Sequence, residues 1–162
     1  MIFPVVEGGS MGSINIGRVI LGGIVAGIVG NILGYLVDGV ILAAQWSASL
    51  KTLGRPEFTG SQIVAFNIIG LVYGILVVWL YAAMRPRFGA GPKTAAYAGL
   101  AAWAIGALLP NVSLMGVVGL FPSNLTAITT AAAIVETVAG ALAGAALYKE
   151  GAGTAQSMAA RP

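Results

Sequence analysis

Residues 19–44 read VILGGIVAGIVGNILGYLVDGVILAA. A helix needs about 20 predominantly apolar residues to cross the roughly 30 Å hydrocarbon core of a bilayer. This stretch exceeds that length, and only Asn31 and Asp38 interrupt its apolar character. It therefore predicts a membrane-spanning helix.

Three further segments have the same character, namely residues 63–84, 94–109 and 125–148. A short apolar segment, 112–121, follows the third span. Because proline removes a backbone donor and clashes with the preceding turn, we expect the third helix to be broken or kinked at Pro110. Segment 112–121 then either continues the kinked third span or forms a short interfacial helix.

The composition of the chain agrees with a membrane protein. Of its 162 residues, 58% are hydrophobic and 8% are charged, and the mean hydropathy is +0.94. A soluble domain carries about 25% charged residues, so this chain has too few charges to cover a water-exposed surface. Low charge and long apolar runs also exclude a disordered chain and a nucleic-acid-binding module.

The chain contains no His and no Cys. It therefore lacks the usual general base, a thiolate nucleophile, disulfides and the commonest metal ligands. We expect a protein that is not an enzyme, with no catalytic residues, no cofactor and no metal site.

The basic residues predict how the chain is oriented, because Lys and Arg accumulate in short cytoplasmic loops. With the N-terminus inside, the inner side holds six of them and the outer side two. The inner six are Arg18, Arg85, Arg87, Lys93, Lys149 and Arg161; the outer two are Lys51 and Arg55.

We thus expect an all-α fold: an integral membrane four-helix bundle, N-in and C-in, in a bacterial inner membrane. Residues 1–162 form a single transmembrane domain, with a flexible tail at 151–162.

Each span carries a stripe of small residues on one helical face. The stripes are Gly23, Gly27, Gly30 and Gly34; Asn67, Gly70 and Gly74; Gly99, Gly106 and Pro110; and Ala133, Glu136, Gly140 and Gly144. Since lipid provides no hydrophobic force between helices, such stripes promote association by close backbone approach. They predict a tight bundle within one chain or, equally, contact with another copy.

Four polar side chains fall on or beside these stripes and form the candidate intramembrane polar site: Glu136, Asp38, Asn31 and Asn67. At 1.5 Å per residue, Glu136 lies about 18 Å from Asn124, close to the depth of Asn31. Asp38 and Asn67 both lie nearer the outer face. These depths predict that Glu136 lies near Asn31 and that Asp38 lies near Asn67.

Two interpretations of the carboxyl groups remain open at this point. A carboxyl group inside the membrane takes up protons or binds a cation, or it stays neutral and hydrogen-bonded and fixes the helix register. Asn31 and Asn67 are more typical of structural hydrogen bonding. The basic residues Arg85, Arg87 and Lys93 are candidate lipid head-group contacts, although a plain positive-inside anchor explains them as well.

Three stretches carry a resemblance: 79–95 (WLYAAMRPRFGAGPKTA), 108–111 (LLPN) and 147–150 (LYKE). They resemble a group of small bacterial inner-membrane proteins of unknown function, over most of residues 18–150. The resemblance implies four spans and transfers no site residue. The chain is also similar in size to small multidrug resistance exporters, whose essential Glu lies in the first span, whereas here that span has Asp38 and Glu136 is in the fourth.

Two functions follow as hypotheses. The first is a structural, accessory or oligomer-forming bundle, alone or in a larger membrane complex, because the loops are short and catalytic chemistry is missing. The alternative is a small proton- or cation-coupled transporter or exporter that uses Glu136. Neither involves nucleic acid; the expected partner of both is the lipid bilayer.

Overall fold

The computed structural model of the protein describes residues 13–150, and this part of the chain is all-helical, without strands. The helices are α1 (Ile16–Gly34), α2 (Ala43–Thr52), α3 (Gly60–Phe88), α4 (Pro92–Trp103) and α5 (Ser123–Leu147). Three π-helical segments, η1 (Tyr35–Ile41), η2 (Ala104–Leu108) and η3 (Asn111–Val117), extend α1 and α4. The predicted tail at 151–162 lies outside the described residues.

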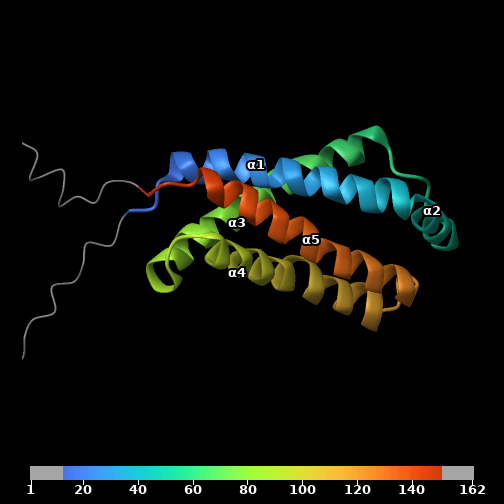
Figure 1. Ribbon diagram of the computed structural model, residues 1–162. Coiled ribbons are helices and arrows are strands. Elements are labelled where there is room, and N and C mark those ends of the chain that lie inside the picture. The colour runs from blue at the N-terminus through green and yellow to red at the C-terminus, as the bar shows by residue number, and fades with distance from the viewer. Residues whose placement is uncertain (1–12, 151–162) are drawn as a thin grey trace, which may run out of the picture.

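Four helices in the described chain are long and apolar enough to cross a membrane: Ile16–Ile41, Gly60–Phe88, Pro92–Val117 and Ser123–Leu147. Successive long helices run in opposite directions along one bundle (Figure 1). The predicted helical bundle is confirmed, and the protein is a multi-pass membrane protein. We call the end with the α3–α4 turn the inner end and the end with α2 the outer end.

Local sequence signals explain where the helices begin and end. The side chain of Asn15 caps α1 by accepting a hydrogen bond from the backbone N–H of Arg18 at 3.1 Å. Thr59 and Gln62 form a reciprocal capping box at the start of α3. Gly89, with φ at 83°, ends α3 in a conformation that a side chain would disfavour.

The first span ends earlier than the sequence predicted, and a helix that the sequence did not predict follows it. The chain bends at buried Leu42 (φ −100°, ψ 4°), and α2 begins at Ala43. Residues 43–44 therefore belong to α2 rather than to the span.

Pro110 disturbs the third span without interrupting it. The helix continues to Val117, and π-helical segments precede and follow the proline. A π-helical turn accommodates an extra residue between hydrogen-bonded groups. The wider turns before and after Pro110 therefore let the helix continue although the proline has no N–H to donate. Segment 112–121 was expected either to continue the third span or to form a short interfacial helix. In the structure, residues 112–117 continue the span and form its end.

Helix α1 packs on α3 through glycine backbone. A side chain on Gly74 would meet the carbonyl oxygen of Gly23 and the backbone of Gly27. A side chain on Gly27 would lie 2.7 Å from the Cα of Leu71. The absence of Cβ atoms thus lets these two backbones touch.

Helix α1 contacts α5 in the same way. A Cβ atom on Gly144 would lie 2.6 Å from the carbonyl oxygen of Gly22, and one on Gly140 would lie 2.8 Å from that of Ala26. Small residues of the predicted stripes therefore pack within the chain. Gly30 is the exception on α1, since nothing lies within 4 Å of its added Cβ.

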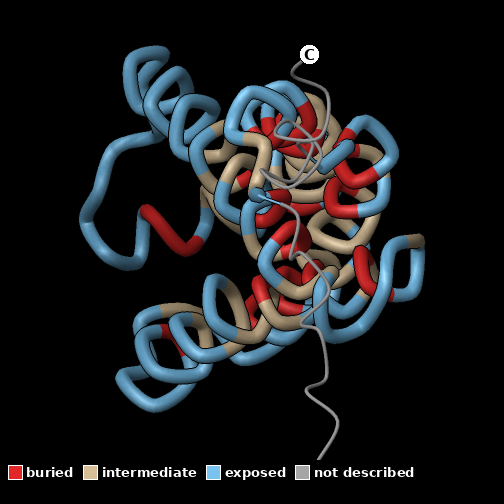
Figure 2. Tube along the Cα trace, turned by 90° about the vertical axis from the view of Figure 1, so that its left-hand side faces the viewer, coloured by how far each residue is buried: buried red, intermediate tan, exposed pale blue. Residues whose placement is uncertain are grey.

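The bundle loosens toward its outer end. The first half of α3 diverges from the other helices (Figure 1), and all of residues 60–69 are exposed (Figure 2). The buried core lies at the inner end and includes Val19, Val78, Tyr81 and Ala98. The glycine contacts and this core together position the polar groups of the outer half.

The glycine contact between α1 and α3 generates a test. We expect Gly74→Ala to lower stability by about 1–3 kcal/mol, because its methyl group meets backbone that cannot move aside. Gly30→Ala is the matched control, and we expect it to be neutral or stabilising by up to about 1 kcal/mol, because it raises helix propensity in open space. Thermal unfolding in detergent, followed by circular dichroism, measures both; equal midpoints would contradict the packing.

Candidate intramembrane polar site

Asp38 lies in η1, near the outer end of the first span. Its Oδ1 atom accepts a hydrogen bond of 3.0 Å from the indole Nε1–H of Trp46 on α2. The Trp46 ring in turn packs edge-on against Phe121, with centroids 5.2 Å apart. The bend at Leu42 therefore folds α2 back so that its tryptophan holds a carboxyl group of the preceding span.

Glu136 lies in the middle of α5 and faces α1 at Gly34. A Cβ atom on residue 34 would be 3.4 Å from the Glu136 Oε2 atom, so the glycine leaves room for the carboxyl group. Glu136 and Asp38 are both half-buried, and Asp38 lies four residues beyond Gly34, in the segment η1 that contacts α5. The structure thus brings together the two acids that the sequence placed on separate spans.

Neither predicted pair is joined by a hydrogen bond in the described chain. Asn31 donates from Nδ2 to the backbone oxygen of Asn67 at 3.0 Å, and no hydrogen bond within residues 13–150 joins it to Glu136. Asn67 donates from its own Nδ2 to the carbonyl of Ile63, one turn earlier on α3, and not to Asp38. Residue number gives the depth of a side chain along its helix, but the packing of the helices decides which neighbouring helix that side chain faces.

The direction of Asn31 follows from the glycine opposite it. A Cβ atom on Gly70 would overlap the amide oxygen of Asn31, so the amide occupies the place of a side chain on α3. Asn31 therefore joins α1 to α3, whereas Glu136 reaches α1 near Gly34. These amides are structural hydrogen-bonding groups in the described chain.

The carboxyl pair has no basic partner among the described residues. The one ion pair found in that part of the chain joins Arg85 to Glu150 at 3.3 Å, at the inner end. The basic residues lie near helix ends or in connections: Arg18, Lys51, Arg55, Arg85, Arg87, Lys93 and Lys149. Two acids thus share the interior of the outer half without a compensating cation from residues 13–150.

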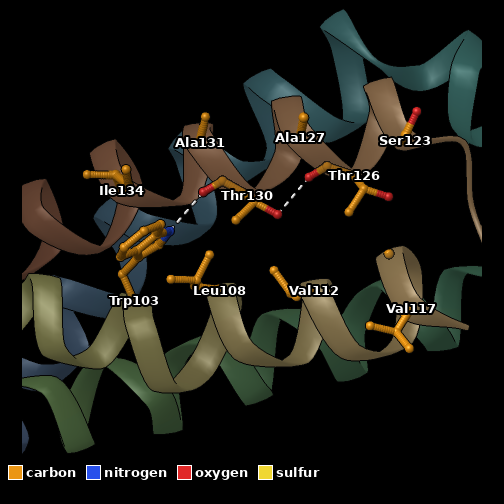
Figure 3. A pocket seen from close by; sticks show the side chains of 11 residues that line it. Trp103, Leu108, Val112, Val117, Ser123, Thr126, Ala127, Thr130, Ala131 and Ile134 are labelled. Atoms are coloured by element: carbon orange, nitrogen blue, oxygen red, sulfur yellow. Dashed lines mark hydrogen bonds between the residues drawn. The ribbon is translucent and has the colours of Figure 1, made fainter.

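A polar cluster that the sequence analysis missed joins the third and fourth spans. The Asn111 amide donates to Thr130 Oγ1 at 2.9 Å, and the Trp103 indole donates to the Thr130 carbonyl at 2.8 Å. The Thr130 hydroxyl donates in turn to the carbonyl of Thr126 (Figure 3). Thr126 and Thr130 are four residues apart and therefore lie on one face of α5. This spacing was the sequence signal that could have indicated the cluster.

The three predicted head-group contacts differ in their surroundings. The Arg85 guanidinium lies 5.2 Å from the ring centroid of Tyr148 and 5.8 Å from that of Tyr81, and it pairs with Glu150. Protein groups therefore surround Arg85. Arg87 and Lys93 are exposed, and Lys93 lies over the Tyr97 ring at 5.9 Å.

The two tyrosines beside Arg85 also connect the helix ends. The Tyr148 hydroxyl accepts from the backbone N–H of Asn15, and the Tyr81 hydroxyl accepts from that of Gly91. The start of α1, the end of α3, the start of α4 and the end of α5 thus meet around one cation.

Comparisons of this chain with protein-family models, with curated proteins and with solved structures find no match. The proposals below therefore depend on geometry and chemistry.

The surroundings of Arg85 generate a prediction. We expect Arg85→Gln to lower stability by about 1–3 kcal/mol, because it removes two cation–π contacts and one ion pair. Arg87→Gln removes the same charge from an exposed position two residues away, and we expect it to stay within about 0.5 kcal/mol of the wild type. Chemical unfolding in detergent compares the two; equal losses would show that charge alone matters at this end.

Proposed function

We propose that this chain is a small, non-enzymatic transporter or exporter of a bacterial inner membrane, coupled to protons or another cation. The observation that carries the proposal is the position of the Glu136 carboxyl group against Gly34, one turn before Asp38, without a basic partner in the described chain. In this proposal the two carboxyl groups form the site that takes up and releases the proton or cation.

The energetic argument starts from the cost of charge in the membrane. An ionised carboxylate at the centre of a spanning helix costs about 2.5–3.5 kcal/mol on insertion scales. A second carboxylate nearby adds repulsion, which a proton or cation bound at the pair removes. Asn31, by contrast, finds its partner inside the bundle, so it needs no ligand.

The surroundings of the pair support exchange with the outer solution. Trp46 ties Asp38 directly to α2, which lies outside the four long helices. The inner half of the bundle is closed by glycine contacts and by the aromatic cluster around Arg85. The outer half therefore offers the shorter route between the acids and water.

The test is proton flux in vesicles reconstituted with purified protein. With an imposed pH gradient and a pH-sensitive dye inside, we expect the wild type to dissipate the gradient faster than protein-free vesicles do. Glu136→Gln keeps the size of the side chain but binds no proton, so we expect it to lose this flux. Asp38→Asn removes the second acid, and we expect it to reduce the flux.

Glu57→Gln is the matched control, because Glu57 is an exposed carboxylate in the α2–α3 connection. It should leave the flux unchanged. Repeating the assay with sodium or potassium gradients identifies a cation other than the proton. If Glu136→Gln conducts as well as the wild type under every gradient, the proposal fails.

A second candidate function is an accessory or oligomer-forming bundle. One observation favours it: the first half of α3 presents apolar side chains that no other described helix covers. They are Ile63, Val64, Phe66, Ile68 and Ile69. The same vesicle assay separates the two functions, because an accessory bundle predicts no flux from the wild type.

A further inference from the structure

An apolar groove runs along the bundle between α5 and the end of the third span. Its volume is about 530 Å³. Trp103 closes its deep end, and Val112 and Val117 form one lip; from α5, Thr126 and Thr130 point toward the third span (Figure 3), and Ala127 and Ala131 are also among the lining residues.

The wall of this groove has no spare hydrogen-bonding side chain in its deep part. The Trp103 indole N–H donates to the carbonyl of Thr130, and the Thr130 hydroxyl donates to that of Thr126. The Thr126 hydroxyl donates to the carbonyl of Pro122 at 3.1 Å. Because a polar ligand would lose hydrogen bonds to water and find no free side-chain donor in this part of the wall, the occupant is a hydrocarbon.

The groove lies within membrane-spanning helices and opens sideways. Val117 on its lip is 81% exposed, and Val112 is 49% exposed, so the opening faces the space that lipid fills. From Ser123 to Ile134 the α5 wall extends about 16 Å at 1.5 Å per residue. Ser123, at the start of α5, lines the outer end of the groove.

The size of the groove distinguishes a lipid chain from a helix of another protein. A helix about 10 Å across and as long as this wall occupies about 1,300 Å³, so a groove of about 530 Å³ admits side chains of such a helix but not its backbone. A single extended hydrocarbon chain is much thinner. We propose that the groove binds one acyl chain of a membrane phospholipid, from the leaflet at the outer end of the bundle. This proposal is independent of the carboxyl pair.

Fluorescence of Trp103 tests the proposal, because its ring lines the deep end of the groove. Trp46→Phe and Trp79→Phe together leave Trp103 as the only tryptophan of the chain. This protein is reconstituted in vesicles of phosphatidylcholine with or without bromine on the acyl chains. We expect the brominated lipid to quench Trp103.

Filling the groove shows whether the quenching chain lies inside it. Ala131→Leu places a larger side chain in the groove, and we expect the quenching of Trp103 to be lost. Ala146→Leu is the matched control on an exposed part of α5 outside the groove, and it should retain the quenching. Ala127→Leu serves as a second filling variant if circular dichroism shows that Ala131→Leu has lost helix.

Two results would overturn the proposal. Equal quenching in the filled and control variants would mean that Trp103 meets only bulk lipid. Absence of quenching in the unfilled protein would mean that no acyl chain enters. Because the natural chain has no Cys, Ala131→Cys also reports on a second copy, and a disulfide-linked dimer through this position would overturn the proposal as well.

Discussion

Contact between helix backbones at glycine positions is the constraint on which the rest of this structure depends. In lipid, helices gain no hydrophobic free energy from burying apolar side chains, so van der Waals contacts and hydrogen bonds between them decide their association. Gly22 and Gly144 place α1 on α5, and Gly23, Gly27 and Gly74 place α1 on α3. Beyond these contacts, toward the outer end, the helices spread apart.

This division between a closed inner half and an open outer half determines where polar groups meet. At Gly34 the missing side chain leaves room for the Glu136 carboxyl group instead of a helix backbone. Asp38 lies one turn further along, held by Trp46. The acids are thus neighbours because the glycine contacts set the register of α1 against α5. The groove beside α5 belongs to the same open half, although its wall is apolar.

Much of the fold could be predicted from the sequence, because apolar runs as long as 19–44 are stable as helices inside the membrane. The polar pairings could not be predicted: rise per residue gives the depth of Asn31, but only the presence of Gly70 opposite turns it toward α3. Helix α2 was missed because Ala43 and Ala44 continue an apolar run, and the bend at Leu42 has no sequence signal. The surroundings of Arg85, a candidate head-group contact, could not be predicted because its partners, Tyr81, Tyr148 and Glu150, are brought together only by the fold.

The central claim is that the small-residue stripes pack within one chain, and the dependence of unfolding on dilution tests it most directly. A Cβ atom on Gly99 of α4 would lie 2.9 Å from the Cα of Val138 and 3.1 Å from the Cβ of Ala141, both on α5, so Gly99→Ala pushes a methyl group against the opposing helix. Contact within one chain predicts that Gly99→Ala lowers the thermal unfolding midpoint by the same amount at a high and at a low protein-to-detergent ratio. A wild-type midpoint that falls on dilution, together with a Gly99→Ala loss that disappears there, would contradict the account.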